Sequence, residues 1–346
     1  MHKDSPSFDR RAFLGDCARF GVLGLFGSTA AAPLLVRVAA AQTPVPTKGA
    51  HLVLLGTQGG PNFSAERNES ANAVVVDGRV YLVDVGEGAL GALRKSGLGH
   101  RSIGRVFLTH LHDDHSADVA SLLSHQWSDG RTEPTVVAGP SGTAALVSAA
   151  LQFGQANATI RLVDEARSIE PADIFRGEDL EATQAPKQIY RDDRVTVSSI
   201  ENTHFPEAAK QQMPYRSLSY RFESRDRSIV FSGDTAYSAN LVRLARGAHV
   251  FVCEAMEVAS MRQAFERMVA GGAYADNPEG IWKHIVETHT STVEAGRMAA
   301  EAEVGTLVLS HLIPGALQPL ADEVYLAGVR QHFDGQAVVG KDLLVL

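Results

Sequence analysis

Short apolar runs alternate with amphipathic stretches along most of the chain, an order typical of layered α/β folds. The apolar runs are rich in Val, Ile and Leu, and several end in a turn that contains Gly. Asp77-Gly78, between the apolar runs 73–76 and 79–85, predicts a tight β-hairpin. Further strands are predicted at 51–56, 105–108, 135–138, 195–201, 217–223, 228–232, 250–253 and 306–309. Helices are predicted at 90–97, 117–123, 141–153, 240–246 and 291–302.

The stretch 257–287 departs from this alternation. Its pattern is helical, it is rich in Met, and it is interrupted at Gly271-Gly272. We therefore predict one domain over residues 42–346, with a helical insert at 257–287.

The first 41 residues have the features of a targeting segment. Arg10-Arg11 is followed by an apolar stretch at 20–38, which ends in Ala39-Ala40-Ala41 before Gln42. This pattern resembles a bacterial Tat signal, which predicts recognition by the Tat export machinery, removal of residues 1–41 and a periplasmic location. Arg19 directly precedes the apolar stretch, and Pro33 and Arg37 interrupt it, so it would make a poor membrane anchor. A Sec-type signal or an uncleaved amphipathic anchor is the alternative.

The chain is acidic, with a net charge of −8 over 346 residues. Taking the five basic and three acidic residues of the predicted signal away from the totals of 32 and 40 leaves a net charge of −10. Phosphate contacts come from clustered Lys and Arg, and no basic tract is visible, so we expect no nucleic-acid partner. The two cysteines are Cys17 and Cys253, and loss of the signal would leave no pair for a disulfide.

The most informative motif is the run of histidines and aspartates that follows the predicted strand 105–108. It contains His110, His112, Asp114 and His115. Imidazole nitrogen and carboxylate oxygen are ligands that zinc and similar metals accept. Two residues apart in an extended chain, His110 and His112 face the same side. The run predicts half of a dinuclear metal site, and the alternative is a polar surface loop rich in histidine.

Other candidate ligands follow other predicted strands: His204, Asp234 and His311. Strand-end loops are where α/β sheets place their ligands. Each of these residues is weak evidence alone, because a single His or a Gly-Asp-Thr turn is common on protein surfaces. Together with the histidine run they predict one shared site.

These motifs resemble the metallo-β-lactamase-fold hydrolases over nearly the whole of residues 42–346. The resemblance is carried by His110-Leu111-His112-Asp113-Asp114-His115, His204, Gly233-Asp234-Thr235 and Ser310-His311. The segments 55–57, 83–88, 231–235, 253–255 and 289–291 are similar to the ribonuclease Z and arylsulfatase-like branch. The resemblance implies an α/β fold, an αββα sandwich of two mixed β-sheets flanked by helices.

The resemblance also implies two metal sites. The first metal would be held by His110, His112 and His204, the second by Asp114, His115 and His311, and Asp234 would bridge them. A hydroxide between the metals would be the nucleophile, since bound metal lowers the pKa of water. Zn²⁺ is the favoured ion, with Mn²⁺ and Fe²⁺ as alternatives.

Three further residues have expected roles around these ligands. Asp84 would accept a proton from a ligand histidine and fix its orientation, unless it is a plain turn carboxylate. In the branch, a histidine matching His289, supported by a glutamate matching Glu254, assists the leaving group, so Asp114, His289 and Glu254 are the expected catalytic residues. His289 as a polar residue beside the next helix is the alternative. Cys253 and His249 depart from the branch, which commonly has His and Asp there.

The sequence therefore predicts an exported, dinuclear, metal-dependent hydrolase of small esters, with arylsulfatase-like activity first and phosphodiesterase or lactonase activity as the alternatives. A non-catalytic periplasmic metal-binding protein is the alternative from another class, and a homodimer stays open. Redox di-iron relatives usually replace a histidine of the run by a carboxylate, and His112 is still histidine.

The predicted insert adds an expectation about the substrate. It would supply an apolar wall that fits an aryl-bearing ester. The wall would consist of Met261, Phe265, Met268, Tyr274 and Trp282. A packed helical hairpin or a dimer surface explains the same pattern equally well.

Overall fold

The computed structural model describes residues 44–346. The predicted targeting segment, 1–41, lies outside the described residues. Within 44–346, no helix combines the length and the apolar character that crossing a membrane requires.

The first sheet has six strands in the order β1-β2-β3-β4-β5-β6. Its first pairs, β1–β2 and β2–β3, are antiparallel, and its later pairs are parallel. The predicted hairpin turn is present, with φ of 47° at Asp77 and 81° at Gly78, which are values that Gly and Asp adopt more readily than most residues. The strands are β1 (Ala50–Gly56), β2 (Ala71–Val76), β3 (Arg79–Val85), β4 (Arg105–Phe107), β5 (Thr135–Gly139) and β6 (Phe175–Asp179).

The second sheet has seven strands in the order β13-β12-β11-β10-β9-β8-β7. Strands β7 to β10 pair antiparallel, and β10 to β13 pair parallel. Both sheets are therefore mixed. The strands are β7 (Lys187–Arg191), β8 (Thr196–Glu201), β9 (Leu218–Glu223), β10 (Ser228–Phe231), β11 (Val250–Met256), β12 (Thr306–Ile313) and β13 (Gln336–Val339).

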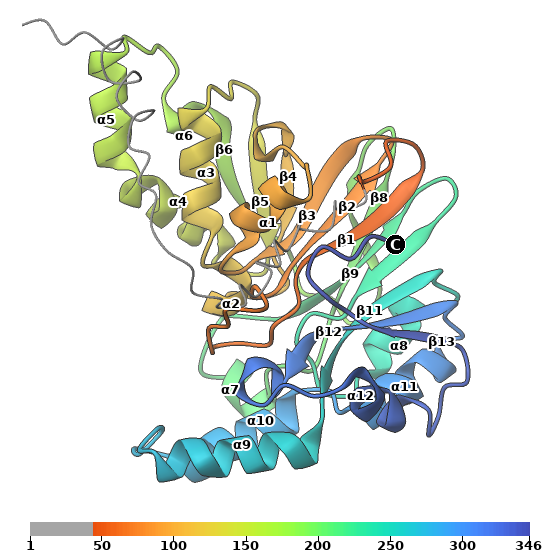
Figure 1. Ribbon diagram of the computed structural model, residues 1–346. Coiled ribbons are helices and arrows are strands. Elements are labelled where there is room, and N and C mark those ends of the chain that lie inside the picture. The colour runs from red at the N-terminus through yellow and green to blue at the C-terminus, as the bar shows by residue number, and fades with distance from the viewer. Residues whose placement is uncertain (1–43) are drawn as a thin grey trace, which may run out of the picture. The chain divides into compact units, whose positions relative to one another are not determined.

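Helices cover the outer faces of both sheets (Figure 1). Those that follow strands of the first sheet are α1 (Ala89–Lys95), α2 (Asp113–Ser116), α3 (Val119–Ser128), α4 (Thr143–Phe153), α5 (Gln155–Asp164) and α6 (Pro171–Ile174). Those that follow strands of the second sheet are α7 (Glu207–Lys210), α8 (Ala239–Ala245), α9 (Val258–Ala270), α10 (Pro278–Thr288), α11 (Thr292–Glu301) and α12 (Asp322–Val329). Short 3₁₀ turns, η2 (His100–Ser102) and η3 (Gly315–Leu317), complete the regular structure.

Strand β3 shows why the strands are apolar on both faces. Val80 and Leu82 pack against the helices of the first sheet, whereas Tyr81 and Val83 pack against the second sheet. Successive side chains of a strand point to opposite faces, so a strand between two apolar layers needs apolar residues at nearly every position. The structure confirms the predicted αββα sandwich, with one core between the sheets and one under each helical layer.

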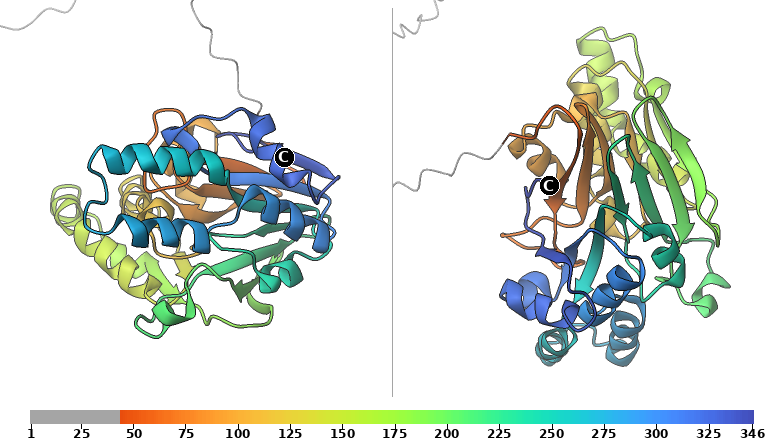
Figure 2. Two further views of the ribbon diagram at one scale, coloured as in Figure 1. Left: turned by 90° about the horizontal axis from the view of Figure 1, so that it is seen from below. Right: turned by 90° about the vertical axis from the view of Figure 1, so that its right-hand side faces the viewer.

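The helices α9 and α10 lie at one end of the sandwich, beyond the carboxyl end of β11 (Figures 1 and 2). They fill most of the stretch 257–287 and form a hairpin with its own small apolar cluster. The same end of the sandwich carries the loop after β4, where the histidine run begins.

A buried tyrosine of the second sheet supports this loop. The Tyr220 hydroxyl donates a 2.6 Å hydrogen bond to the carbonyl of Leu108, and both residues are fully buried. Replacing Tyr220 by Phe removes the donor and leaves a buried carbonyl without a partner. We expect Tyr220→Phe to lower the free energy of unfolding by about 1–3 kcal/mol in urea titrations.

The matched control is Tyr190→Phe on the neighbouring edge of the same sheet. The Tyr190 hydroxyl bonds to Asp192, which is only partly buried and keeps other donors from Arg79 and Tyr81. We expect Tyr190→Phe to lower the free energy of unfolding less than Tyr220→Phe does. Equal decreases in the two variants would show that the hydrogen bond to Leu108 stabilises the protein no more than an ordinary surface contact.

Candidate metal centre

The histidine run begins in extended chain and then enters a short helix. His110 follows β4, His112 has φ −65° and ψ 154°, and α2 begins at the next residue. Nε2 of His110 and Nδ1 of His112 lie 2.9 Å apart. The turn into α2 places Asp114 and His115 on the other side of the site, as the sequence pattern predicts.

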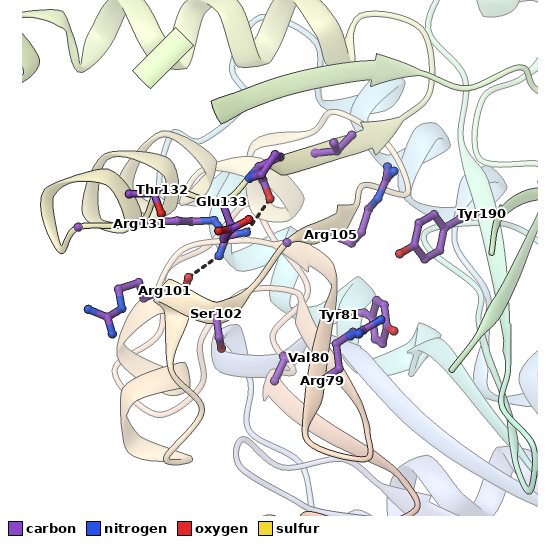
Figure 3. Close-up of a pocket in the computed structure, with 14 residues that line it drawn as sticks. Arg79, Val80, Tyr81, Arg101, Ser102, Arg105, Arg131, Thr132, Glu133 and Tyr190 are labelled. Carbon is purple, nitrogen blue, oxygen red and sulfur yellow. Dashed lines mark hydrogen bonds between the residues drawn. The ribbon is translucent and has the colours of Figure 1, made fainter. Parts of the chain in front are cut away.

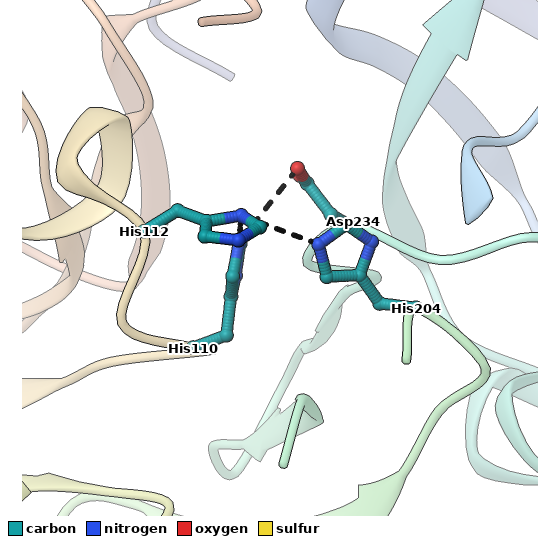
Figure 4. A group of neighbouring side chains, drawn as sticks. All are labelled: His110, His112, His204 and Asp234. Atoms are coloured by element: carbon teal, nitrogen blue, oxygen red, sulfur yellow. Dashed lines mark hydrogen bonds and ion pairs between the residues drawn. The ribbon is translucent and has the colours of Figure 1, made fainter. Parts of the chain in front are cut away.

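The first candidate group contains His110, His112, His204 and Asp234, whose ligand atoms all lie within 4.8 Å of one another (Figure 4). His204 follows β8, and its Nε2 lies 3.3 Å from Nδ1 of His112. Asp234 follows β10, with a carboxylate oxygen 3.8 Å from Nε2 of His110. Three imidazoles and a carboxylate from three strand ends therefore converge on one point.

The second candidate group contains Asp114, His115, Asp234 and His311, again within 4.8 Å. Nε2 of His311 lies 3.1 Å from Asp114 and 3.2 Å from Asp234. His311 is a bulge in β12, because Glu254 of β11 pairs with Ser310 and Ala255 pairs with Leu312. The bulge gives His311 a φ of 44° and turns its side chain into the site.

The donor set fits bound cations. Nε2 of His115 and Oδ1 of Asp234 are buried without a hydrogen-bond partner although they lie 3.2 Å apart. Buried polar atoms normally have partners, so these two unpaired atoms, which face one another, fit a site for a bound cation. Asp234 belongs to both groups, and a carboxylate has one oxygen for each of two ions. The two groups could hold two divalent metals, and nitrogen and oxygen donors of this kind accept Zn²⁺ as well as other ions.

The electrostatics of the groups suit metal binding. Burial lowers the pKa of His110 and of His204 well below the usual value, so both are neutral imidazoles with a free lone pair. Burial alone would raise the pKa of Asp234, but His311 and His115 outweigh it and lower the pKa well below the usual value. The carboxylate that the two groups share is therefore ionised.

Contacts behind the histidines fix their orientation. Asp84 accepts hydrogen bonds from Nδ1 of His115 at 2.9 Å and from the backbone N–H of Thr109 at 2.7 Å. This is the contact expected of Asp84, and its φ of 61° shows that the end of β3 is bent to make it. On the far side, Nδ1 of His204 lies 3.2 Å from the carbonyl of Thr288, the last residue of α10.

The structure brings His289 and Glu254 together beside the two groups. Nδ1 of His289 lies 2.8 Å from Oε2 of Glu254 and 3.8 Å from Asp234. Burial would lower the pKa of His289, but Glu254 more than compensates and raises it. His289 does not cap the N-terminus of α11, because Ser291 and Glu294 form the capping box of that helix. Glu254, His289, Asp234 and His311 also form a third cluster of donor atoms.

A cavity of about 240 Å³ opens onto the site. His112, Asp114, Asp234, His289 and His311 line one side of it. An apolar wall faces them, formed by Met261, Tyr274, Ile281, Ile285, Ile313 and Leu317.

This wall differs in composition from the predicted one. Of the expected residues, Met261 and Tyr274 line the cavity, whereas Phe265 and Trp282 pack behind it with ring centroids 5.4 Å apart. Met268 does not line it either. A helical pattern reports which residues are apolar, but which of them face the cavity depends on how the two helices pack.

Sequence reasoning missed His284. It lines the cavity from α10, with its ring centroid 5.7 Å from that of His204 and 5.8 Å from that of His289. Partial burial and the nearby His289 and His112 lower the pKa of His284 to about 4, so it is neutral at neutral pH. The sequence contained a signal for His284: it stands three residues after Ile281, so the two side chains share one face of a helix.

A larger cavity of about 830 Å³ lies at the other ends of β3, β4 and β5, where these strands begin (Figure 3). It is lined by Arg79, Arg101, Arg105 and Arg131, which come from separate segments. Arg79 lies 2.9 Å from Asp192, and Arg105 lies 3.2 Å from Glu178. These ion pairs neutralise two of the four arginines, and none of the three clusters of metal-binding donor atoms lies in this cavity.

Comparisons with known proteins agree with this geometry. The family described as Anti-Pycsar protein Apyc1 matches residues 50–262. A ribonuclease Z of Mycolicibacterium paratuberculosis is 31% identical over 84% of this chain and 96% of its own. A ribonuclease Z of Mycobacterium avium is 30% identical over the same shares.

Solved structures share the fold. The metallo-β-lactamase-fold protein YhfI of Bacillus subtilis has a TM-score of 0.59 at 17% identity, covering 86% of this chain and 98% of its own. The short form of human tRNase Z has a TM-score of 0.57 at 20% identity, with the same coverage.

Fold and site define a metal-dependent hydrolase of the metallo-β-lactamase fold. Within that class, the chain belongs to the family described as Anti-Pycsar protein Apyc1, and it is related to the ribonuclease Z enzymes.

The expectation that nucleic acid is excluded as a partner is wrong. The relatives at 30–31% identity are named for cleaving RNA. The net charge averages over the whole surface, whereas a nucleic acid touches one face, so overall acidity does not exclude it. The absence of a basic tract in the sequence is equally uninformative, because separate segments can bring arginines together, as in the large cavity.

The contact between Asp84 and His115 yields a test of the metal centre. His115 and the backbone N–H of Thr109 each donate to a different carboxylate oxygen of Asp84. Asn in place of Asp84 keeps the size of the side chain but replaces one of these two oxygens by an amide nitrogen. We expect Asp84→Asn to weaken metal affinity about 10- to 100-fold in competition with a fluorescent chelator.

Asp113→Asn is the control for that variant, because Asp113 is an exposed carboxylate at the first position of α2 and belongs to none of the three donor clusters. Equal metal affinities in Asp84→Asn and the unaltered protein would remove the orienting role of Asp84.

Proposed function

We propose that the protein hydrolyses phosphodiesters with two divalent metal ions. The observation that carries the proposal is the pair of donor groups that share Asp234 at the mouth of a cavity, with His289 and Glu254 beside them. The ribonuclease Z relatives add support, since cleavage of RNA is hydrolysis of a phosphodiester.

Bound metals and the protein's own side chains would have different roles in the reaction. Bound metals would supply an activated water and offset the negative charge of the ester. The chain holds the donor atoms in a buried site, where Asp84 and Thr109 fix the ring of His115. Asp114, predicted to be catalytic, is fixed by the backbone N–H of Gly60, which donates to it at 2.9 Å. This preorganisation removes the cost of arranging charged groups during the reaction.

His289 would hold and move the proton. Its Nδ1–H donates to Glu254, which leaves Nε2 for the substrate. The raised pKa of His289 favours the protonated ring, so Nε2–H can donate a proton to the leaving oxygen as the ester bond breaks. Glu254 then stabilises the ring through the hydrogen bond that it keeps.

Arylsulfatase-like activity is the second candidate, favoured by the apolar wall beside the site. A sulfate monoester resembles a phosphodiester in carrying a single negative charge on a centre with similar geometry. Assays of bis(4-nitrophenyl) phosphate, 4-nitrophenyl sulfate, a lactone and a short RNA, each with and without chelator, separate these activities. No hydrolysis of any of them by the metal-loaded protein would support the non-catalytic metal-binding alternative.

A pair of variants separates metal binding from proton transfer. His112→Ala removes a donor from the first group, and we expect it to lower metal content and abolish activity. His289→Ala removes the proton donor and leaves every atom of the first two donor groups, so we expect unchanged metal content and a kcat about 10²- to 10⁴-fold lower.

The measurements for this pair are metal analysis and steady-state kinetics on the same preparations. An equal loss of metal in the two variants would make His289 part of the metal site, which the third donor cluster allows. Substrates with a good leaving group, such as 4-nitrophenolate, should lose less activity in His289→Ala than those with a poor one.

We also propose that residues 1–41 direct export through the Tat machinery, which rests on Arg10-Arg11 and the small residues before Gln42. We expect replacement of both arginines by Lys to keep the protein in the cytoplasm in a cell-fractionation experiment. Export at the normal level would contradict a Tat signal and leave the Sec-type alternative.

A further inference from the structure

The helical hairpin presents an apolar surface to the candidate metal centre. Ile281, His284 and Ile285 stand three and four residues apart on α10, so they share one face, and all of them line the cavity. Met261 of α9 and Tyr274 of the connecting loop extend the surface, and Ile313 and Leu317 close it. We call the part of the cavity lined by Met261, Tyr274, Ile281, Ile285, Ile313 and Leu317 the ring pocket.

The ring pocket has a firm support. Behind it, the ring of Phe265 stacks on Tyr274 with centroids 5.9 Å apart and also packs against Trp282. The guanidinium of Arg262 lies 4.8 Å from the centre of the Trp282 ring on its outer side. Met261 and Phe265 are almost fully buried in this cluster. The wall is therefore held by packing within the hairpin, and a bound group does not have to create it.

The charges around the cavity select against a second anionic group. Among the described residues that line it there is no Lys or Arg, and its acidic side chains are Asp113, Asp114 and Asp234. His289, the candidate proton donor, also lines the cavity, but it lies beside the metal centre, 3.8 Å from Asp234, and not on the apolar wall. A phosphate or carboxylate bound in proteins normally takes partners such as Arg, Lys or backbone N–H groups. The metal centre can neutralise one ester group, but a further negative charge at the wall would find none of these side chains.

The size of the cavity limits what it can hold. Its volume of about 240 Å³ lies just below the roughly 300–1,000 Å³ of sites that enclose drug-sized ligands. One planar ring fits this space, and burying its apolar surface against the side chains of the wall is favourable.

We propose that the ring pocket binds one flat, uncharged ring of the substrate. The ring belongs to one of the hydroxyl compounds that are joined in the ester, and the ester reacts at the metal centre. The ring is an aryl group or a nucleobase, which share this chemistry. The inference rests on the proposed function, because the ester is taken to be a phosphodiester.

Binding of three phosphodiesters that each carry one negative charge tests the proposal. Dimethyl phosphate, methyl phenyl phosphate and uridine 3′-(methyl phosphate) are titrated by calorimetry into the metal-loaded His289→Ala variant, in which we expect hydrolysis to be slow. We expect each diester with a ring to bind at least about tenfold more tightly than dimethyl phosphate. Tighter binding of the uridine compound identifies the ring as a nucleobase, and tighter binding of the phenyl compound identifies it as an aryl group.

A charged ring is the second arm. We expect 4-carboxyphenyl methyl phosphate to lose the advantage of the ring, because its carboxylate meets a wall without Lys or Arg. Equal affinities for dimethyl phosphate and methyl phenyl phosphate would overturn the proposal, as would undiminished binding of the carboxylated ring.

Neighbouring residues of α10 supply a matched pair of variants. Ile285 lines the ring pocket, whereas Val286 is 39% exposed and does not. We expect Ile285→Ala to reduce the preference for the phenyl compound severalfold and Val286→Ala to leave it unchanged. Ile281→Ala is a second test of the same wall, and an unchanged preference in both isoleucine variants would place the ring elsewhere.

The outcome separates this proposal from the proposed function. Hydrolysis of bis(4-nitrophenyl) phosphate without any preference for rings would overturn the ring pocket and leave the phosphodiesterase standing. A preference for rings without hydrolysis of any ester would support the pocket and remove the phosphodiesterase.

Discussion

The buried carboxylate of Asp234 is the constraint on which the rest of the site depends. It is 2% exposed and lies 3.2 Å from both His115 and His311, and 3.8 Å from His110 and His289. Burying a lone carboxylate costs several kcal/mol, so this position is tolerable only where positive or donor groups surround it. The surrounding imidazoles satisfy that need in part, and the unpaired Oδ1 shows what is left for a cation. The other candidate ligands lie around this one residue.

The fold meets the constraint by bringing strand ends of both sheets to one place. The first sheet delivers the histidine run after β4 and Asp84 at the end of β3, and the second delivers His204, Asp234 and His311. The bulge at His311 interrupts the regular alternation of side chains in β12 at the point where the strand reaches the site. The positive φ values of Asp84 and His311 mark where the backbone departs from regular geometry to serve the site.

The apolar runs and the polar residues at their ends were sufficient to predict a layered α/β fold and the convergence of the candidate ligands, whereas the αββα sandwich itself was predicted from the resemblance to a known family. The sequence was insufficient for β6 and β7, whose residues are largely polar and exposed at the sheet edges, so they lack the apolar signature of a central strand. The strand of His311 was expected to end at 309, and its bulge depends on pairing with β11. The face of α10 that carries His284, and the residues of the apolar wall, depend on helix packing, which a periodic pattern does not fix.

The hairpin joins the chemistry of the site to the selection of its substrate. The donor groups lie on strand ends and loops of the sandwich, whereas most of the apolar wall comes from α9, α10 and their loop. Substitutions in the wall could therefore leave the donor groups unchanged. The donor groups and the wall are tied at one point, the carboxyl end of α10. There the carbonyl of Thr288 holds His204 at 3.2 Å, and the next residue, His289, meets Glu254. A displacement of α10 would therefore move a candidate metal ligand, the candidate proton donor and the wall together. Substitutions on the cavity face of α10 can change the ring that is bound, but changes at its last turn must preserve the geometry of the metal centre.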